Sequence, residues 1–397
     1  MPYDPVKDVY HDAPPEEGRA PEPRAYAPLY RVTPPESVLI PITKEQVEAL
    51  KRQSQNPLRA RAQPPPEVPR GTVRPAEVPI GELERTTVAT HYNKRREVGR
   101  DARESSPIIP LKRFNNWVKS ALISMYAQVG WNAGQGARIL ELGCGKGGDL
   151  RKWDRHRPAV MVLIDIADVS IEQARLRYEE GHYRWAAEFF AFDCFRRPLD
   201  EVVPRSLLEP LFDTVSMQFC LHYGWDSEEN ARTMLSNAAR WLRPGGTLIG
   251  TTVDDETLLA RLHEDEHAVS FGNECYRIEF DQRLEPGEKP FGNRYHFWLL
   301  DAVDNVPEFV VDWAAFTRYV AATDACGLHL VYKARFDEIL SDGYANRPLR
   351  QLLERMQVID SNMAAAGVVT PAMPPAMWHV CTLYMGFALE KSVDATA

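Results

Sequence analysis

Five short apolar runs that alternate with helical segments constrain the fold of this chain more than any other feature of its sequence. The runs are rich in Val, Ile, Leu and Phe without strict polar alternation, which is typical of parallel strands covered on both faces. They are residues 137–142, 159–166, 189–195, 212–219 and 247–253. The alternation predicts an α/β fold with a Rossmann-like, doubly wound and mostly parallel sheet.

Two helical patterns define buried stripes. Residues 110–126 place apolar side chains at helical spacing, from Phe114 to Met125, on one face. Residues 227–242 begin with Ser227 as an expected N-cap, and their stripe continues to Leu242 before Pro-Gly-Gly. A further helix is expected at 170–180, after the second run.

Two other segments depart from the alternation. Residues 1–85 hold 17 of the 31 prolines and lack sustained periodicity, which is typical of a disordered arm; one short helix is conceivable at 43–52. Residues 259–300 contain short β-like pieces and predict a small antiparallel insert. We therefore expect a disordered Pro-rich arm at 1–85 and one folded domain at 86–397, with a β subdomain inserted at 259–300.

Composition excludes several classes of protein. The six cysteines form no C-x-x-C pair, so we expect no metal site and a reducing compartment. The sequence offers neither a signal peptide nor a membrane span, which predicts a soluble intracellular protein. The net charge of −9 argues against indiscriminate binding of nucleic acid. The segment from His91 to Lys119, however, contains eight Lys or Arg and only three acidic residues. This excess of positive charge predicts a local patch that faces an anion.

A glycine-rich turn, ILELGCGKGGDL, follows the first apolar run at 139–150. Glycines allow the backbone to approach a ligand, and Asp165 at the end of the second run can accept hydrogen bonds from both ribose hydroxyls. Gly143, Gly145 and Gly148 also satisfy the dinucleotide pattern G-x-G-x-x-G. The turn alone therefore fits either a nicotinamide cofactor or another nucleoside cofactor.

Three features favour S-adenosylmethionine. Glu141 extends the turn to E-x-G-x-G-x-G, a pattern typical of Rossmann-like methyltransferases, and would lie near the amino end of the methionine moiety. Asp193, at the end of the third run, can accept a hydrogen bond from an adenine amino group. The turn WLRPGGTLIG before the fifth run is also typical of that class. Lys146 is a surplus cation beside a sulfonium, so we expect the methyl acceptor to bring phosphates.

Long blocks along the chain resemble one family. They are VATHYNKR, SPIIPLKRFNNWVKS, ILELGCGKGGDLRKW, DIADVSIEQARLRY, FDTVSMQFCLHYGWDSEENAR, PGGTLIGTT, AVDNVPEFVV and TLYMGFALEK. With these blocks, in this order, the chain resembles the cellular mRNA cap guanine-N7 methyltransferases from about residue 88 to 390. The Pro-rich arm is not covered. The resemblance implies methyl transfer from S-adenosylmethionine to N7 of the guanosine linked 5′ to 5′ through triphosphate to mRNA.

Motif and resemblance together imply two groups of site residues. The expected cofactor contacts are Lys119, Glu141, Gly143, Gly145, Asp165, Asp193, Cys194, Gln218 and Tyr223. The expected cap contacts are Tyr92, Asn115, Asn116, Lys146, Arg177, Phe219, His222, Tyr223, Glu308 and Tyr384. Arg175 is a rival for the triphosphate contact assigned to Arg177.

The chemistry of guanine agrees with these assignments. A carboxylate such as Glu308 can accept both the N1-H and the 2-amino group, a pairing that adenine cannot copy. Phe219, His222 and Tyr223, in the stretch QFCLHYGWDSEEN (218–230), can hold the purine plane by stacking. Guanine N7 has a lone pair and no proton, so we expect positioning by Tyr223, His222 and Glu308 rather than acid or base catalysis.

Some departures and alternatives remain. Val253 stands where the family often has proline, and Met377 and His379 stand where acids are common; these changes leave cap affinity and the orientation of Tyr384 open. A methyltransferase acting on another phosphorylated nucleotide or RNA would share the cofactor half, and a non-catalytic cap-binding scaffold would share the pocket. The resemblance implies a nuclear, monomeric catalytic domain that binds capped mRNA. Contact between the arm and the RNA polymerase II tail or the capping machinery, and the need for an activating subunit, stay open.

Overall fold

The computed structural model describes residues 80–94, 104–128, 136–285, 289–321, 326–359, 369 and 371–393, with side chains of the first helix from residue 87 onward. The helix considered at 43–52 and the arm before residue 80 lie outside these ranges. Helix α2 (Ile80–Lys94) continues through residue 85, where the boundary between arm and domain was expected. No helix within the described ranges has the length and apolar character needed to cross a membrane.

A seven-stranded sheet forms the centre of the folded part, in the order β10-β11-β5-β4-β1-β2-β3. Its strands are β1 (Arg138–Leu142), β2 (Val160–Asp165), β3 (Ala186–Ala191), β4 (Phe212–Gln218), β5 (Leu242–Val253), β10 (Leu328–Arg335) and β11 (Tyr384–Lys391). The five strands β1 to β5 pair in parallel, whereas β11 pairs antiparallel with β5 and with β10. The predicted Rossmann-like, mostly parallel fold is confirmed.

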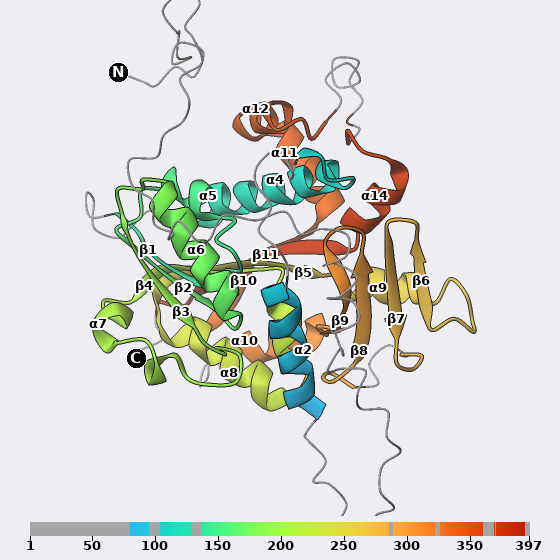
Figure 1. Ribbon diagram of the computed structural model, residues 1–397, viewed down its shortest axis with the longest axis horizontal. Helices are drawn as coiled ribbons and strands as arrows, with labels where there is room; N and C mark the ends of the chain where they lie inside the picture. Colours follow the sequence, from blue (N-terminus) through green and yellow to red (C-terminus); the bar gives the residue numbers. More distant parts are fainter. Residues whose placement is uncertain are drawn as a thin grey trace, which may run out of the picture. The chain divides into compact units, whose positions relative to one another are not determined.

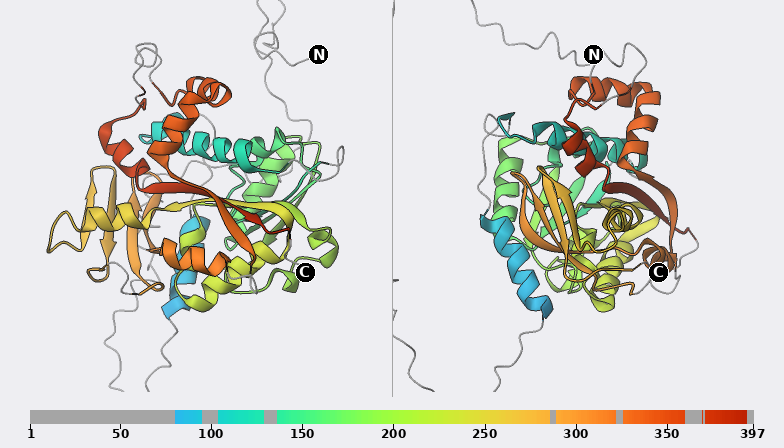
Figure 2. Two further views of the ribbon diagram at one scale, coloured as in Figure 1. Left: turned by 180° about the vertical axis from the view of Figure 1, so that it is seen from behind. Right: turned by 90° about the vertical axis from the view of Figure 1, so that its right-hand side faces the viewer.

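Helices cover both faces of this sheet (Figures 1 and 2). Helices α4 (Ile109–Tyr126), α5 (Leu150–Asp154) and α6 (Asp168–Glu180) cover one face, and α8 (Glu228–Arg240) and α10 (Trp313–Ala321) cover the other. The remaining helices are α7 (Arg205–Leu208), α9 (Asp255–Leu262), α11 (Phe336–Ala345), α12 (Arg347–Arg355) and α14 (Pro375–Cys381), with 3-10 turns at Leu199–Glu201 and Leu221–Gly224. Leu140 and Ile139, consecutive in β1, are buried in opposite layers, which explains the apolar run without alternation.

Two helix predictions need correction in detail. In α4 the buried stripe passes through Ile123, which is 1% exposed, whereas Met125 is 38% exposed. Ser227 caps α8 as expected by accepting a hydrogen bond from the Asn230 amide. The helix ends at Arg240, however, and Leu242 begins β5, because it pairs with Phe212 of the neighbouring strand β4.

The parallel strands also end slightly differently from expectation. Strand β3 runs from Ala186 to Ala191, because these residues pair with Val160 to Asp165 of β2. Asp193 therefore lies two residues beyond the strand rather than at its end. Its side chain still belongs to the carboxyl edge of the sheet, the edge at which open α/β sheets bind ligands.

A second, antiparallel sheet has the order β6-β7-β8-β9. Its strands are β6 (Ser270–Asn273), β7 (Tyr276–Phe280), β8 (Arg294–Leu299) and β9 (Val303–Phe309). It extends beyond residue 300, the end of the expected insert, because β9 pairs along β8. Residues 259–262 belong to helix α9 rather than to this sheet. The last strand, β9, carries Glu308.

Candidate active site at the carboxyl edge of the parallel strands

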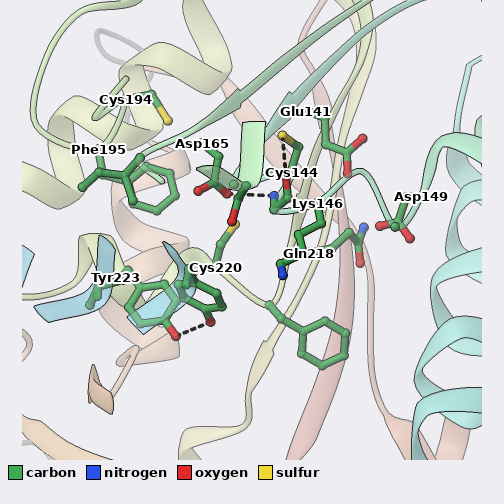
Figure 3. A pocket seen from close by; sticks show the side chains of 18 of the residues that line it. Glu141, Cys144, Lys146, Asp149, Asp165, Cys194, Phe195, Gln218, Cys220 and Tyr223 are labelled. Atoms are coloured by element: carbon green, nitrogen blue, oxygen red, sulfur yellow. Dashed lines mark hydrogen bonds between the residues drawn. The ribbon is translucent and has the colours of Figure 1, made fainter. Parts of the chain in front are cut away.

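A cavity of about 450 Å³ lies where strands β1, β2, β3 and β4 end. Its walls come mainly from the loops after these strands, with further side chains from helices α2 and α4 and from strand β9. Figure 3 shows Glu141 and Asp149 at one side of this cavity, Tyr223 at the other side, and Asp165 between them. The cavity therefore has a charged end and an aromatic end.

The glycine-rich turn forms the floor between these ends. The amides of Gly143 and Cys144 donate to the Ile164 carbonyl at 2.8 and 3.0 Å, which ties the turn to β2. Gly143 has a φ of +71°, and an added Cβ would lie 2.7 Å from the Cβ of Cys220. A side chain is therefore excluded there on two grounds. The amide of Gly145 donates to Asp165 Oδ2 at 2.7 Å, and this bond fixes the Asp165 carboxylate at the cavity wall.

The charged end is a buried cluster of two acids and two lysines. Asp149 Oδ1 lies 2.7 Å from the ammonium groups of both Lys119 and Lys152. Burial opposes ionisation of Asp149, but the two ammonium groups outweigh burial and hold the pKa of this carboxyl below its ordinary value. Burial, and then the charge of Asp149, raise the pKa of the neighbouring Glu141 to about 8. The two carboxyls therefore differ: both lysines pair directly with Asp149, whereas at Glu141 their charges are outweighed by burial and by the charge of Asp149.

Glu141 supplies the observation that tests the cofactor. Its Oε2 atom is buried and has no partner at hydrogen-bonding distance in the part of the chain that the structure describes, although the Trp153 side chain is near enough to lower the pKa of this carboxyl. A buried acceptor without a partner is costly unless a ligand supplies one. The cationic amino end of S-adenosylmethionine would supply it, so the residues present fit this cofactor. Asp193 and Cys194 line the far part of the same wall.

The aromatic end lies after β4, in the stretch 218–230. Phe219 adopts a φ of +58°, a strained conformation for a bulky residue that turns the chain sharply at the end of β4. The hydroxyls of Tyr92 and Tyr223 lie 2.9 Å apart and form a hydrogen bond that joins α2 to this turn. Phe219 and Tyr223 both line the cavity. The stretch therefore presents aromatic rings beside the polar floor.

Glu308 lies behind Tyr223 in a buried polar group. The Tyr295 hydroxyl donates to Glu308 Oε2 at 2.8 Å, and the Tyr223 hydroxyl lies 3.4 Å from Oε1. His222 Nε2 lies 3.5 Å from Glu308 Oε1. Burial raises the pKa of Glu308 to about 7 and lowers the pKa of His222 to about 3. His222 is therefore neutral at neutral pH, and Glu308 is poised to ionise there.

The structure brings many of the expected site residues to this cavity. Those that line it are Tyr92, Lys119, Glu141, Gly143, Gly145, Lys146, Asp165, Arg177, Asp193, Cys194, Gln218, Phe219 and Tyr223. Arg177 lies in the wall. Its rival Arg175, also on α6, stacks over the ring of Phe189 in β3 and pairs with Glu172.

Five expected cap contacts do not line the cavity. His222 and Glu308 form the buried group behind Tyr223, and Tyr384 packs edge-on against Phe219 with ring centroids 5.1 Å apart. Asn116 faces a separate groove, where its Oδ1 accepts a hydrogen bond from Lys152 at 2.8 Å. Asn115 lines neither of these two spaces.

Several residues of the site were missed from the sequence, among them Asp149, Tyr295 and Arg196. Asp149 ends the glycine-rich turn, and its acidic position directly before α5 was an available signal. Tyr295 and Arg196 gave no such signal. Tyr295 reaches Glu308 only through the pairing of β8 with β9, and Arg196 lines the cavity while its guanidinium holds Asp226 at 2.6 Å.

Of the departures from the family pattern, Val253 lies directly beside Tyr384. Val253 is buried directly opposite Tyr384 in the antiparallel pair of β5 and β11. Met377 is also buried, and His379 Nδ1 lies 2.9 Å from the Tyr276 hydroxyl. Tyr384 is thus oriented by packing against Phe219 and Phe336.

Comparisons with known proteins place this chain in a family. Residues 80–392 match the mRNA (guanine-N(7))-methyltransferase domain. The mRNA cap guanine-N(7) methyltransferase of Cryptococcus neoformans is 44% identical over 311 residues, which cover 77% of this chain and 48% of that protein. The Schizosaccharomyces pombe protein of the same name is 37% identical over 306 residues, which cover 77% of this chain and 81% of that protein.

This chain spans about half the length of the Cryptococcus relatives that it matches. Among solved structures, an S-adenosylmethionine-dependent methyltransferase from Clostridium acetobutylicum aligns with a TM-score of 0.41 and 10% identity, over 71% of this chain and 92% of that chain. The match over residues 80–392, and the extent of the similarity to the Schizosaccharomyces protein, show that the chain belongs to the mRNA (guanine-N(7))-methyltransferase family.

Proposed function

We propose that this chain transfers a methyl group from S-adenosylmethionine to N7 of the guanine cap of mRNA, converting GpppN-RNA to m7GpppN-RNA. The observation that carries the proposal is the single cavity whose charged end holds the unpartnered carboxylate oxygen of Glu141 and whose aromatic end holds Phe219 and Tyr223. Such a cavity can hold a cationic donor and a flat heterocycle side by side. Family membership supports the same activity.

On the donor side, S-adenosylmethionine supplies an electrophilic methyl group on a positively charged sulfur. We assign Glu141 to the amino end of this cofactor, with Lys119 beside it in the lysine pair that neutralises Asp149. Asp165 still has acceptor capacity for the ribose hydroxyls beyond its bond to Gly145. Asp193, Cys194 and Gln218 complete the wall, with Asp193 assigned to the adenine amino group.

On the acceptor side, Glu308 selects guanine. In this proposal its ionised carboxylate accepts the guanine N1-H and 2-amino group in place of the long contact with the Tyr223 hydroxyl. Phe219, Tyr223 and His222 hold the base plane, and Tyr384 supports Phe219 from behind. His222 stacks as a neutral ring, because burial lowers its pKa to about 3.

The phosphates of the cap require cations near the cavity mouth. Lys146 and Arg177 line the cavity. Lys146 belongs to the glycine-rich turn, and Arg177 belongs to helix α6. We assign them to the triphosphate, with Tyr92 at the same side. A Lys and an Arg together provide a point charge and a planar fork, both suited to phosphate oxygens.

Catalysis in this proposal rests on positioning. Guanine N7 attacks with a free lone pair and no proton to lose, so the chain needs to hold N7 in line rather than move a proton. The buried rings exclude water from the reacting atoms. Positive charge moves from the sulfonium to the guanine during methyl transfer. The carboxylates of Glu141, on the donor side, and Glu308, on the base side, would stabilise this charge.

The direct test is incubation of the protein with radiolabelled S-adenosylmethionine and unmethylated GpppG-capped RNA. We expect label in m7G, and none in a parallel reaction with uncapped triphosphate RNA. Label on the uncapped RNA would favour a methyltransferase for another phosphorylated substrate, and inhibition by free cap analogue would argue against that alternative. Tight cap binding without label would identify a non-catalytic scaffold.

The proposed partner is the capped 5′ end of mRNA, and we place the protein in the nucleus, where nascent transcripts are processed. Recruitment through residues 1–79 to the RNA polymerase II tail or to the capping machinery is part of the same proposal. It can be tested by co-precipitation of the full chain and of residues 80–397 with a phosphorylated polymerase tail peptide. Equal recovery of the two chains would remove the arm from the proposal.

A further inference from the structure

A second groove, with a volume of about 680 Å³, lies on the outer side of the glycine-rich turn. Its walls are side chains of α4, α5 and α12, together with Glu104, Gly148 and residues just after α12. Figures 1 and 2 show α4 and α12 on the same side of the central sheet, with α5 beside the end of α4. The groove is distinct from the cavity described above but adjoins it.

The groove is strongly cationic in a chain of net charge −9. Its cations are Arg113, Arg151, Lys152, Arg155 and Arg355. Glu104 is the only carboxylate of the wall in the ranges that the structure describes. Lys152 is committed to Asp149, but the four guanidinium groups leave a clear positive excess. Such an excess in one groove of an acidic protein fits a polyanion.

The groove continues from the phosphate side of the active-site cavity. Gly148 lines both spaces, so they meet at the glycine-rich turn. Arg177, on the cavity side, and Arg151, on the groove side, both interact electrostatically with Tyr183. Burial lowers the pKa of Arg177, and the nearby charge of Arg151 lowers it further. Arg177 of the cavity and Arg151 of the groove are thus close enough for their charges to interact, and the two spaces share Gly148.

We propose that this groove, formed by α4, α5 and α12, binds the backbone phosphates of the first RNA nucleotides that follow the cap. The inference rests on the proposed function, because the chain of phosphates must begin at the cap triphosphate beside Lys146 and Arg177. An RNA strand leaving that point would enter the groove beside Arg151, which interacts with Arg177, and would find Arg113, Arg155 and Arg355 in the same groove. An acidic peptide could bind the same cations. However, only the RNA is covalently attached to the cap, so only the RNA must pass from the cavity into the neighbouring groove.

The binding is expected to be independent of base sequence. Guanidinium groups contact phosphates without reading bases, and each phosphate contact releases a counterion from the RNA. The groove should therefore lower KM for capped RNA, with an effect that weakens as salt rises. It should leave turnover of a free cap dinucleotide unchanged, since that ligand ends at the cavity mouth.

The test removes three groove cations that have no place in the active-site cavity, in the variant R113A/R155A/R355A. Its matched control removes three exposed arginines from distant elements, in R205A/R277A/R318A. Both are assayed in the full chain with GpppG and with GpppG-capped RNA of about 20 nucleotides, at salt from about 50 to about 200 mM. Unchanged turnover of GpppG shows that a variant is folded and that its cavity works.

We expect the groove variant to raise KM for capped RNA about tenfold at the lowest salt, with kcat unchanged and no change for GpppG. The slope of log KM against log salt should fall by about 2, because three single-strand phosphate contacts are lost. The control variant should match the wild type on both substrates.

Equal KM of the groove variant and the wild type for capped RNA would overturn the inference. Binding of a polyglutamate probe distinguishes the alternative occupant. If the groove variant lost affinity for this probe while its KM for capped RNA stayed the same, the RNA inference would be overturned and the groove would be assigned to an acidic protein partner. Failure of the proposed function looks different: the wild type would then methylate neither GpppG nor capped RNA, and the inference would fall with it.

Discussion

At the scale of single residues, the site is governed by carboxyl groups whose neighbours differ. Asp149 is buried between two lysines and stays ionised, whereas Glu141 and Glu308 are buried without a cation that neutralises them. Burial without compensation raises a carboxyl pKa, because the charged form loses its hydration. Glu141 is therefore the carboxyl to which a ligand can supply a missing partner, whereas Glu308 already accepts hydrogen bonds from Tyr295 and Tyr223.

The first residue-scale prediction concerns the pH dependence of cap binding. Glu308 must be ionised to accept two hydrogen bonds from guanine, and its pKa is raised to about 7. Below this value the protonated form dominates, so KM for GpppG at saturating cofactor should rise as pH falls. From about pH 8 to about pH 6 we expect close to a tenfold increase. The Glu308→Gln variant should bind more weakly, and its KM should no longer follow pH in this range.

A second prediction concerns Glu141. Its folded pKa of about 8 lies above its ordinary value, so the ionised unfolded state is increasingly favoured as pH rises from about 4.5 to 8. Glu141→Gln removes this penalty. Without cofactor, the variant should therefore lose less thermal stability than the wild type between about pH 5 and pH 8. Its KM for S-adenosylmethionine should rise at least about tenfold, since a charge-assisted bond is lost. If the wild type and Glu141→Gln lost the same thermal stability between about pH 5 and pH 8, the raised pKa assigned to Glu141 would be contradicted.

At the scale of elements, the ends of the parallel strands position the site. The turn after β1, the end of β2, the loop after β3 and the sharp turn after β4 all meet at one sheet edge. Strand β9 of the antiparallel sheet adds Pro307 and Phe309 to the cavity wall and holds Glu308 behind Tyr223. The site therefore depends on how closely the glycine-rich turn can pack against the turn at Cys220.

Gly143 tests this packing. Gly143→Ala would place a Cβ 2.7 Å from Cys220 and would strain a φ of +71°, so both stability and cofactor binding should fall. We expect a loss of about 1 to 3 kcal/mol in the free energy of unfolding, measured by chemical denaturation without ligand. Gly148→Ala is the matched control in the same turn, because its Cβ would meet no atom within 4 Å. Equal stability of the two variants would show that the turn relaxes.

At the scale of the whole molecule, the site belongs to the folded unit of residues 75–397. All the described side chains that line the cavity lie at or after Val88, and the family match begins at residue 80. We therefore assign every group of the proposed activity to this unit, from residues that the structure describes.

A truncation tests this division. A chain of residues 75–397 should methylate GpppG with kcat and KM within about twofold of the full chain, because every group that we assign to the donor or the base is retained. The measurement is steady-state methyl transfer with both substrates varied. A tenfold loss of kcat would place part of the catalytic machinery in residues 1–74.

Much of the fold was accessible from the sequence, because apolar runs and helix caps act over a few residues. The alternation predicted the parallel sheet, and the spacing in 139–150 placed Glu141 and Gly143 in a ligand-binding turn. Element ends were less predictable. The third strand ends at Ala191 rather than at 195, because its pairing partner in β2 sets the register.

The sequence by itself thus determined the order of strands and helices, the glycine-rich turn and the family resemblance, all of which depend on short-range patterns. Only the tertiary structure decided which charges meet. Asp149 pairs with Lys119 from another element, Glu308 meets Tyr295 through strand pairing, and Arg113 and Arg355 line the same groove. The partners in each case lie on different elements, and only the packing or pairing of whole elements brings them together.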